Sequence, residues 1–526
     1  MKDEDVMVQI QTSHGPVKGH KWHDNSDIMS YIDIPYGKFN GPFDAPDTAQ
    51  SWLDVHHITE HTKRCPQLDD DEYIGDTNCL TLSIFTPKDA ENASVLFHVY
   101  DGYSDTKSAD PSIYGPDYLV PKGIILVLPN YRLGPLGFLC MQNETAPGNA
   151  GLKDLSLALE WVKENVHLFG GNRNNIVVSG DGAAGAYVGY LAIYSRSKYY
   201  INKVITESGS ALSHWAFDRD PIGTAYKLIE KIRTNYSDGE IYNNTFGVSL
   251  KTIVKAAKGI RFSPCLEHDT EPFIDTTPWE MLQGSEIDTT FMIGSASYAG
   301  AREAIDTTTD ELNENLEQFL PRDLTFNSNE ERKEFARQLK NQYFNEDNIT
   351  LEELSLWHTD ASYLGPSIRL ARPLLTAGAT VYLYEFAFVG TLNQELVSME
   401  NAVPGAVRRD IVGYIFYKDE TTVDDDSPEK HMINTMVDLW VSFINTGKPT
   451  AEKVAWNDLK KSEDTEEEWL LIDSKPKAVK GIHVDRLRLW TRLYNEHFIE
   501  HSSALRHYRP HHGLAVITTL MCWMAN

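Results

Sequence analysis

The fold is decided by the stretch Ile176-Val177-Val178-Ser179-Gly180-Asp181-Gly182-Ala183-Ala184-Gly185. Its apolar residues predict a buried strand, its glycines a tight turn, and its small residues the start of a helix. This is the setting of the G-x-S-x-G motif, in which a strained turn exposes a nucleophilic serine. Here Gly182 stands where the serine is expected, and Ala184 replaces the second glycine. The stretch therefore predicts the architecture of a hydrolytic turn without its nucleophile.

The segments around this stretch alternate between strand and helix patterns. Apolar runs without polar alternation predict strands that are buried on both faces, at 95–100, 124–128, 204–207, 291–294 and 381–386. Helical spacing follows between Leu152 and Phe169, and again after Gly182. We expect an α/β fold with a mostly parallel central sheet and helices on both faces.

The remaining segments predict additions to this α/β unit. Residues 6–60 indicate an antiparallel β region, and the charged residues 301–365 indicate a helical cap. Amphipathic helices are predicted over 407–417, 428–444 and 484–499. No linker or repeat divides the chain, so we expect one domain over residues 1–500 and a tail over 501–526.

Composition limits the classes of function. The 526 residues carry a net charge of −28, which argues against nucleic acid and anionic lipid as partners because both require a cationic surface. The chain has no C-x-x-C and no Cys/His zinc spacing, and its histidines and Asp runs are better explained as solvated surface. We therefore expect no metal and no cofactor.

Cysteines and sequons favour an extracellular location. Cys65 and Cys79 close a short acidic loop and are candidates for a disulfide, whereas the pairing of Cys140, Cys265 and Cys522 stays open. N-x-[ST] sequons predict glycosylation at Asn92, Asn143, Asn235, Asn243 and Asn348.

The ends of the chain carry less information. No apolar segment typical of a signal peptide follows Met1, and no run of 18 apolar residues predicts a membrane span. Residues 502–526 run from small residues through a polar spacer to an apolar end, an order typical of a GPI-attachment signal. The alternatives are a disordered tail or a last helix that packs on the body.

Several long motifs occur in a fixed order along the chain. They are Asn78–Leu82 with Phe85–Pro87, Asn130–Leu139, Pro147–Asp154 with Ala158–Val162, Phe169–Asn172, and Glu207–Ala211. In these motifs the chain resembles the type B carboxylesterase/cholinesterase family. The resemblance implies the α/β-hydrolase fold, and it implies that Cys65 and Cys79 form that family's first disulfide.

The residues that the resemblance places at the catalytic positions carry no catalytic chemistry. Acyl transfer needs a nucleophile, a base, an acid that orients the base, and donors for the oxyanion. The matching positions hold Gly182 for the serine, Ala299 for the acid and Pro404 for the histidine. The oxyanion loop contains Asp101-Gly102-Tyr103, in which Asp101 adds a negative charge where the reaction itself develops one. We therefore expect no enzymatic activity.

The resemblance also indicates what such a protein does instead. Within the family the chain is most similar to the catalytically dead adhesion branch that includes neurotactin. This implies heterophilic binding of an extracellular or cell-surface protein, of immunoglobulin type in several members of the branch. A homodimer through the late helices, over 407–417 and 484–499, is a further expectation.

Two other interpretations stay open. A vestigial esterase gorge lined by Trp215, Tyr103 and Tyr298 would bind a small apolar ligand, although these aromatic residues are more simply explained as cavity-filling core. Residual carboxylesterase activity through another serine is the least favoured, because no histidine and acid can be assigned to Ser208, Ser179 or Ser104.

Overall fold

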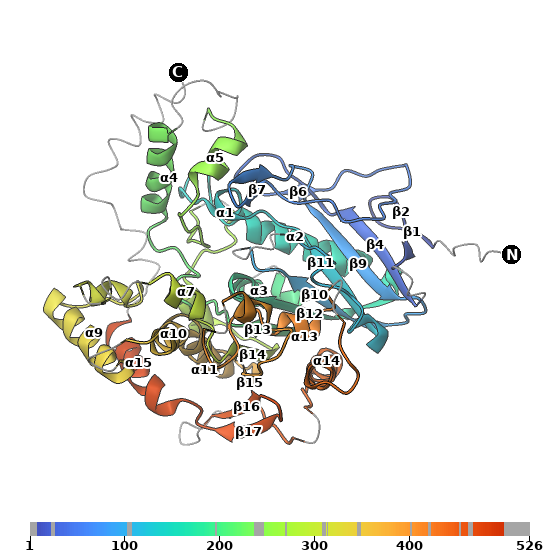
Figure 1. The fold of residues 1–526 in the computed structure, drawn as a ribbon. Helices are drawn as coiled ribbons and strands as arrows, with labels where there is room; N and C mark the ends of the chain where they lie inside the picture. The colour runs from blue at the N-terminus through green and yellow to red at the C-terminus, as the bar shows by residue number, and fades with distance from the viewer. Residues whose placement is uncertain are drawn as a thin grey trace.

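The structure, a computed structural model, is built on one large sheet (Figure 1). It describes residues 8–22, 27–102, 108–194, 197–235, 247–268, 271–307, 312, 314–344, 349–399, 402–418, 422–451, 454–460 and 467–498. The sheet has eleven strands, in the order β17 (Lys477–Lys480), β16 (Glu468–Ile472), β15 (Thr380–Phe386), β14 (Thr290–Ala296), β13 (Lys203–Glu207), β12 (Gly171–Asp181), β10 (Ala93–Val99), β11 (Ile124–Pro129), β9 (Thr81–Pro87), β4 (Ile28–Pro35) and β3 (His20–Lys21).

The centre of the sheet is parallel and its edges are antiparallel. Strands β11, β10, β12, β13, β14, β15 and β16 pair in parallel. Strands β9, β4 and β3 at one edge and β17 at the other pair antiparallel. The apolar runs predicted as strands all lie in this sheet, which confirms the mostly parallel sheet. The N-terminal β region is also present, partly as the small pairs β1–β2 (Gln9–Gln11, Pro16–Lys18), β5–β6 (Gly37–Lys38, Asp47–Thr48) and β7–β8 (Gln67–Asp69, Glu72–Ile74).

Helices surround the sheet (Figure 1). They are α1 (Gly134–Phe138), α2 (Ala150–Asn165), α3 (Ala183–Ile193), α4 (Pro221–Asn235), α5 (Leu250–Ala256), α6 (Pro278–Gly284), α7 (Ala301–Ile305), α9 (Asn329–Tyr343), α10 (Leu351–Thr359), α11 (Gly365–Thr376), α12 (Gln394–Ser398), α13 (Val412–Ile415), α14 (Pro428–Thr446) and α15 (Val484–His497). Short 3₁₀ turns lie at Val120–Lys122, Val166–Phe169, Ser197–Tyr200 and Leu316–Phe319, and a π-helical turn lies at Asp360–Leu364.

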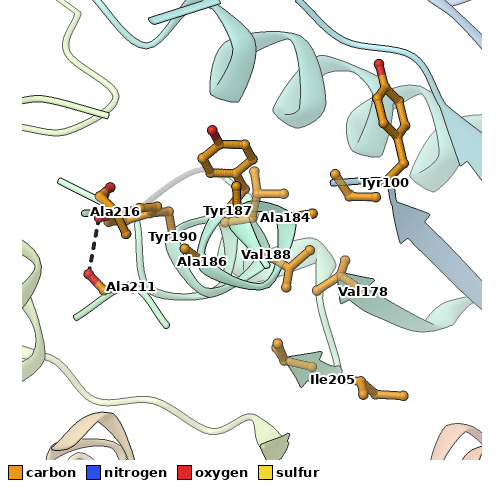
Figure 2. Close-up of a cluster of buried hydrophobic side chains, with 14 of the residues drawn as sticks. Tyr100, Val178, Ala184, Ala186, Tyr187, Val188, Tyr190, Ile205, Ala211 and Ala216 are labelled. Carbon is orange, nitrogen blue, oxygen red and sulfur yellow. Dashed lines mark hydrogen bonds between the residues drawn. The ribbon is translucent and has the colours of Figure 1, made fainter. Parts of the chain in front are cut away.

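Helix α3 is buried along its whole length. All eleven of its residues are buried, so it has no solvent-facing side and depends on tertiary packing. Figure 2 shows it among Val178 of β12, Ile205 of β13 and the aromatic ring of Tyr100. The Tyr190 hydroxyl lies within hydrogen-bond distance of the Ala211 and Ala216 carbonyls, at 3.2 and 2.8 Å. The turn between β12 and α3 is thus held rigidly in the core.

One predicted helix is wrong. Of residues 407–417, only Val412–Ile415 are helical. The Asp410 carboxylate accepts hydrogen bonds from the Val407 and Leu396 amides, at 2.8 and 3.1 Å, and Arg409 has a left-handed φ of 74°. These features favour a turn over a continuous helix. Since Tyr414 and Ile415 are buried, this segment offers no amphipathic face for a dimer.

Two disulfides tie loops to the sheet. The predicted bond between Cys65 and Cys79 is confirmed, and a second bond joins Cys140 to Cys265 across 125 residues. Cys522 and the whole predicted tail lie outside the described residues. Within the described ranges, no helix has the length and apolar character needed to cross a membrane.

Candidate functional site

The turn at Gly182 lies at the carboxyl end of β12, the sixth of the eleven strands. Gly182 has φ 57° and ψ −122°, a left-handed conformation that L-residues rarely adopt. Its amide donates to the Glu207 carbonyl at 2.9 Å. A Cβ added here would lie 2.5 Å from Asp101 Oδ2 and 2.9 Å from Arg408 Nη1. The strained turn therefore has the predicted shape, but the space for a side chain is already filled.

An ion pair fills that space. Asp101 lies two residues beyond the end of β10, and its Oδ2 accepts from Arg408 Nη1 at 2.8 Å. The Asp101 side chain is 1% exposed and that of Arg408 18% exposed. The negative charge that the sequence placed in the oxyanion loop is thus compensated by a guanidinium. The adjacent Tyr103 and Ser104 lie outside the described residues.

Two further buried carboxyl groups end the neighbouring strands β12 and β13. Burial raises the pKa of Asp181 well above its usual range, and the charges of Glu207 and Asp101 raise it further. Neither carboxyl oxygen of Asp181 has a hydrogen-bond partner among the described residues. Burial also raises the pKa of Glu207 to about 7, although the Ser208 hydroxyl donates to its Oε1 at 2.8 Å. Protonation of these two groups removes charge that burial disfavours.

A cavity of about 270 Å³ adjoins the turn. Ala183, Ala299 and Arg408 line it together, so the structure brings the positions predicted for nucleophile and acid to one site. It does not bring Pro404 there. Pro404 is exposed on a bend, and Arg408 is the residue of this segment that reaches Gly182.

The assignment of Pro404 to the histidine position stays a prediction from the resemblance. In the structure Arg408, and not Pro404, lines the cavity. Two consecutive arginines within an otherwise apolar segment were the sequence signal for a buried charge at this point.

Aromatic side chains form another part of the cavity wall. Trp215 and Tyr363 line it, and Trp215 Nε1 donates to the Ser362 carbonyl at 2.9 Å. Ser362 and Tyr363 belong to the π-helical turn, a distortion that is frequent at functional sites. Tyr298 does not line the cavity, and its hydroxyl donates to Glu352 at 3.0 Å. Of the two predicted aromatic residues that the structure describes, Trp215 lines the cavity and Tyr298 does not, whereas Tyr103 lies outside the described residues.

A serine–histidine pair is present, but it is inaccessible. The Ser179 hydroxyl lies 2.9 Å from His98 Nδ1, with the two side chains 0% and 3% exposed. Burial, assisted by the charge of Arg409, lowers the pKa of His98 to about 3, so the imidazole is neutral. Ser208 is also fully buried and hydrogen-bonded to Glu207. Neither serine lines the cavity.

The predicted glycosylation sites are only partly within the described ranges. Asn92 is exposed at a turn with φ 54°, and Asn143 is half-buried, with its Oδ1 accepting from two backbone amides. Asn243, Asn348 and the side chain of Asn235 lie outside what the structure describes. No group of three side chains suited to a metal ion occurs among the described residues.

Comparison with known proteins identifies the family. The carboxylesterase family profile matches residues 5–490. The chain is 29% identical over 493 residues to Esterase FE4 of Myzus persicae, covering 84% of this chain and 85% of that protein. It is 33% identical over 222 residues to the bile salt-activated lipase of Homo sapiens, covering 40% and 29% respectively. The chain belongs to the carboxylesterase family.

Solved structures show the same fold. The juvenile hormone esterase of Manduca sexta, solved with OTFP covalently attached, superposes with a TM-score of 0.81 at 22% identity, covering 93% of this chain and all of that one. A PNB esterase superposes with a TM-score of 0.74 at 23% identity, covering 91% and 99%. The predicted α/β-hydrolase fold is confirmed. These relatives are named as esterases and a lipase.

Proposed function

We propose that this chain is a non-catalytic member of the carboxylesterase family that acts in heterophilic recognition at the outer cell surface. One observation carries the proposal: the Asp101–Arg408 pair occupies the space where the side chain of a nucleophile at position 182 would begin. Ala299 stands at the position of the acid, and the carboxylate that a side chain at position 182 would meet, Asp101, is paired with the Arg408 guanidinium. Loss of a nucleophile or base costs on the order of 10⁶-fold in turnover.

Recognition of a protein partner fits the molecule better than another chemistry does. The two disulfides are typical of an oxidising, extracellular environment. The body carries a net charge of −28, so partners with a basic surface gain in association rate. The resemblance to the adhesion branch suggests an immunoglobulin-type partner. The same proposal includes glycans at the sequons and a GPI anchor. It also includes a homodimer, for which α15 is the one of the two expected contact helices that remains.

The loss of catalysis is tested with a p-nitrophenyl ester and a fluorophosphonate probe for reactive serines. We expect no saturable hydrolysis above that of the heat-denatured protein, and no labelling. An active juvenile hormone esterase is the positive control. Saturable turnover that is abolished by the probe contradicts the proposal, and labelling of Ser179 or Ser208 would then identify the alternative nucleophile.

Recognition is tested with beads coated with the purified chain. We expect these beads to bind a subset of cells that express other surface proteins but not to aggregate with each other. A matched control carries heat-denatured protein at the same density. Aggregation of the coated beads alone would show homophilic binding and contradict the heterophilic proposal.

The second candidate function, binding of a small apolar ligand, has less support from the lining of the cavity. Seven of its thirteen lining residues are charged, namely Arg261, Arg302, Glu303, Asp306, Glu395, Arg408 and Arg409. An apolar ligand would desolvate these groups without pairing them, which disfavours binding.

A further inference from the structure

The charges around the cavity are unusual for this chain. The whole sequence has 76 acidic residues against 48 basic ones, whereas the cavity is lined by four arginines and three carboxylates. One of the carboxylates, Glu395, is already engaged by Arg409 at 2.8 Å. An acidic protein thus gathers four guanidinium groups at one small cavity. Because Asp101 also pairs with Arg408, four carboxylates balance them, and an anionic occupant has to bind the guanidinium donors that these carboxylates leave unused.

Two of these arginines retain unused hydrogen-bond donors. Arg408 gives its Nη1 to Asp101, but its Nε is buried and has no acceptor among the described residues. Arg302, at the start of α7, is exposed, and its side chain has no hydrogen bond or ion pair within the described ranges. A guanidinium binds a carboxylate through two parallel hydrogen bonds, which is its strongest pairing. A buried donor without an acceptor is costly until a ligand supplies one.

The remaining wall is apolar and aromatic. Trp215 and Tyr363 contribute their rings, and Ala183, Ala299, Met399 and Val407 contribute small or aliphatic surface. Tyr363 is fixed by a hydrogen bond to Glu303, and Trp215 by its bond to Ser362. The volume of about 270 Å³ lies just below the range of roughly 300–1,000 Å³ for drug-sized ligands. The occupant is therefore small and combines a charged end with an apolar body.

We propose that the cavity binds a small organic acid whose carboxylate is held by Arg302 and Arg408. The apolar body of the acid lies against Trp215 and Tyr363. Ester hydrolysis in an active site of this fold releases a carboxylic acid, so the ligand resembles the product rather than the substrate of such a reaction. This inference concerns the cavity alone and is independent of the protein partner proposed above.

The test uses the purified chain with benzoate and phenylacetate, and with benzamide and benzyl alcohol as neutral analogues. Titration calorimetry measures affinity. Because the chain has 11 tryptophans, the part of the fluorescence quenching that is lost in Trp215→Phe reports the position of the ligand. We expect saturable 1:1 binding of the acids and binding of the neutral analogues weakened at least about tenfold, as the loss of a charge-assisted pair predicts. Absence of saturable binding by both acids up to about 10 mM, or equal affinity for benzamide, overturns the proposal.

Variants localise the site. Arg302→Gln, at an exposed position, is expected to fold normally and to weaken benzoate binding about fivefold to tenfold. Arg408→Gln is expected to weaken it more, with circular dichroism confirming the fold. The matched control is Arg337→Gln on α9, an arginine that is 68% exposed and paired with Glu334 on the same helix. Unchanged affinity in Arg302→Gln relative to Arg337→Gln overturns the assignment, even where Arg408→Gln fails to fold.

Discussion

Two buried arginine–aspartate pairs in this molecule differ in how fully their hydrogen bonds are formed. Arg132 and Asp154 are both 0% exposed and form two bonds of 2.8 and 2.6 Å, while the Arg132 Nη1 also donates to the Asp44 carbonyl at 2.7 Å. In the pair of Asp101 with Arg408, one guanidinium nitrogen donates to the carboxylate, the Arg408 Nε has no acceptor among the described residues, and a cavity lies beside Arg408. The first pair is saturated and links the loop after β11 to α2. In the second pair the guanidinium is not saturated, and the pair lies beside the turn at Gly182.

The difference shows how hydrogen-bond saturation separates an ion pair that only stabilises the fold from an ion pair that can also bind a ligand. A buried pair in which every donor has an acceptor rigidifies the fold and binds nothing else. A buried pair with a spare donor beside a cavity can bind a ligand without being broken. Substitution of one member of each pair should therefore have different consequences.

Removal of Arg132 gives the largest expected loss of stability. Arg132→Met leaves the Asp154 carboxylate buried without its partner, so we expect the free energy of unfolding to fall by about 3–5 kcal/mol. Arg408→Met is expected to cost less, about 1–3 kcal/mol, because Arg408 lines the cavity and loss of its guanidinium would open a path for water to Asp101. Urea denaturation followed by tryptophan fluorescence measures both. Equal losses for the two variants would remove the distinction between the pairs.

Restoring a serine at position 182 gives the next largest effect. Gly182→Ser places a Cβ against Asp101 in a left-handed conformation, so we expect a loss of about 2–4 kcal/mol and no gain of esterase activity. Gly123→Ser is the matched control, because Gly123 has φ 86° but no atom within 4 Å of the added Cβ. It should cost about 1–2 kcal/mol.

A double variant separates the causes of this loss. Asp101→Gly in the Gly182→Ser background removes the carboxylate that meets the new side chain. It should recover part of the stability lost, and additivity of the two single changes would show that the clash contributes nothing.

The stability of the chain should depend on pH through Glu207. Its pKa is about 7 in the folded chain against 4.5 ordinarily, so between these values the folded state holds a proton that the unfolded state has lost. The free energy of unfolding therefore falls as the pH rises from about 4.5 to 7. Glu207→Gln should flatten this slope and raise stability at pH 8 by on the order of 2 kcal/mol. Thermal unfolding at pH 5, 6, 7 and 8 measures it.

The control for this pH effect is Glu160→Gln, at an exposed position on α2. This variant should keep the pH profile of the unchanged chain. Parallel profiles for Glu207→Gln and the unchanged chain would instead contradict the assignment of the slope to Glu207.

The smallest effect is expected at the surface of the helical cap. Arg337 pairs with Glu334 three residues earlier on α9, and both side chains are largely exposed. Exposed pairs of this kind are screened by water and salt and contribute little to stability. Arg337→Ala should leave the midpoint of thermal unfolding unchanged, as differential scanning calorimetry can measure. A marked fall in this midpoint would show that exposed ion pairs stabilise this chain to an extent that hydrogen-bond saturation does not explain.

The sequence predicted the fold well because its strands are buried on both faces. Runs such as 124–128 and 204–207 have no alternation and flank a strongly helical segment, so local pattern and tertiary burial agree. The segment 407–417 was mispredicted because its apolar spacing suits a helix, whereas Asp410 and the left-handed Arg409 impose a turn. The extent of the single domain stays a prediction.

The candidate site was predictable only where it follows local motifs. Gly182 and Ala299 each lie in a short stretch with a fixed spacing, and in the structure Ala299 and Ala183, the neighbour of Gly182, line the cavity. Arg408 was missed because its partner Asp101 lies 307 residues earlier in the chain. No local pattern reports such a pairing, and the arginines of the cavity come from three separate segments, at 261, 302 and 408–409.

The position of the Asp101 carboxylate also couples three residues that are far apart in the chain. A side chain at position 182 meets Asp101, and loss of Asp101 alone leaves the Arg408 guanidinium beside Gly182 without this counter-ion. Each single substitution is thus opposed by the residue not yet changed, so Gly182, Asp101 and Arg408 should tolerate change together better than one at a time.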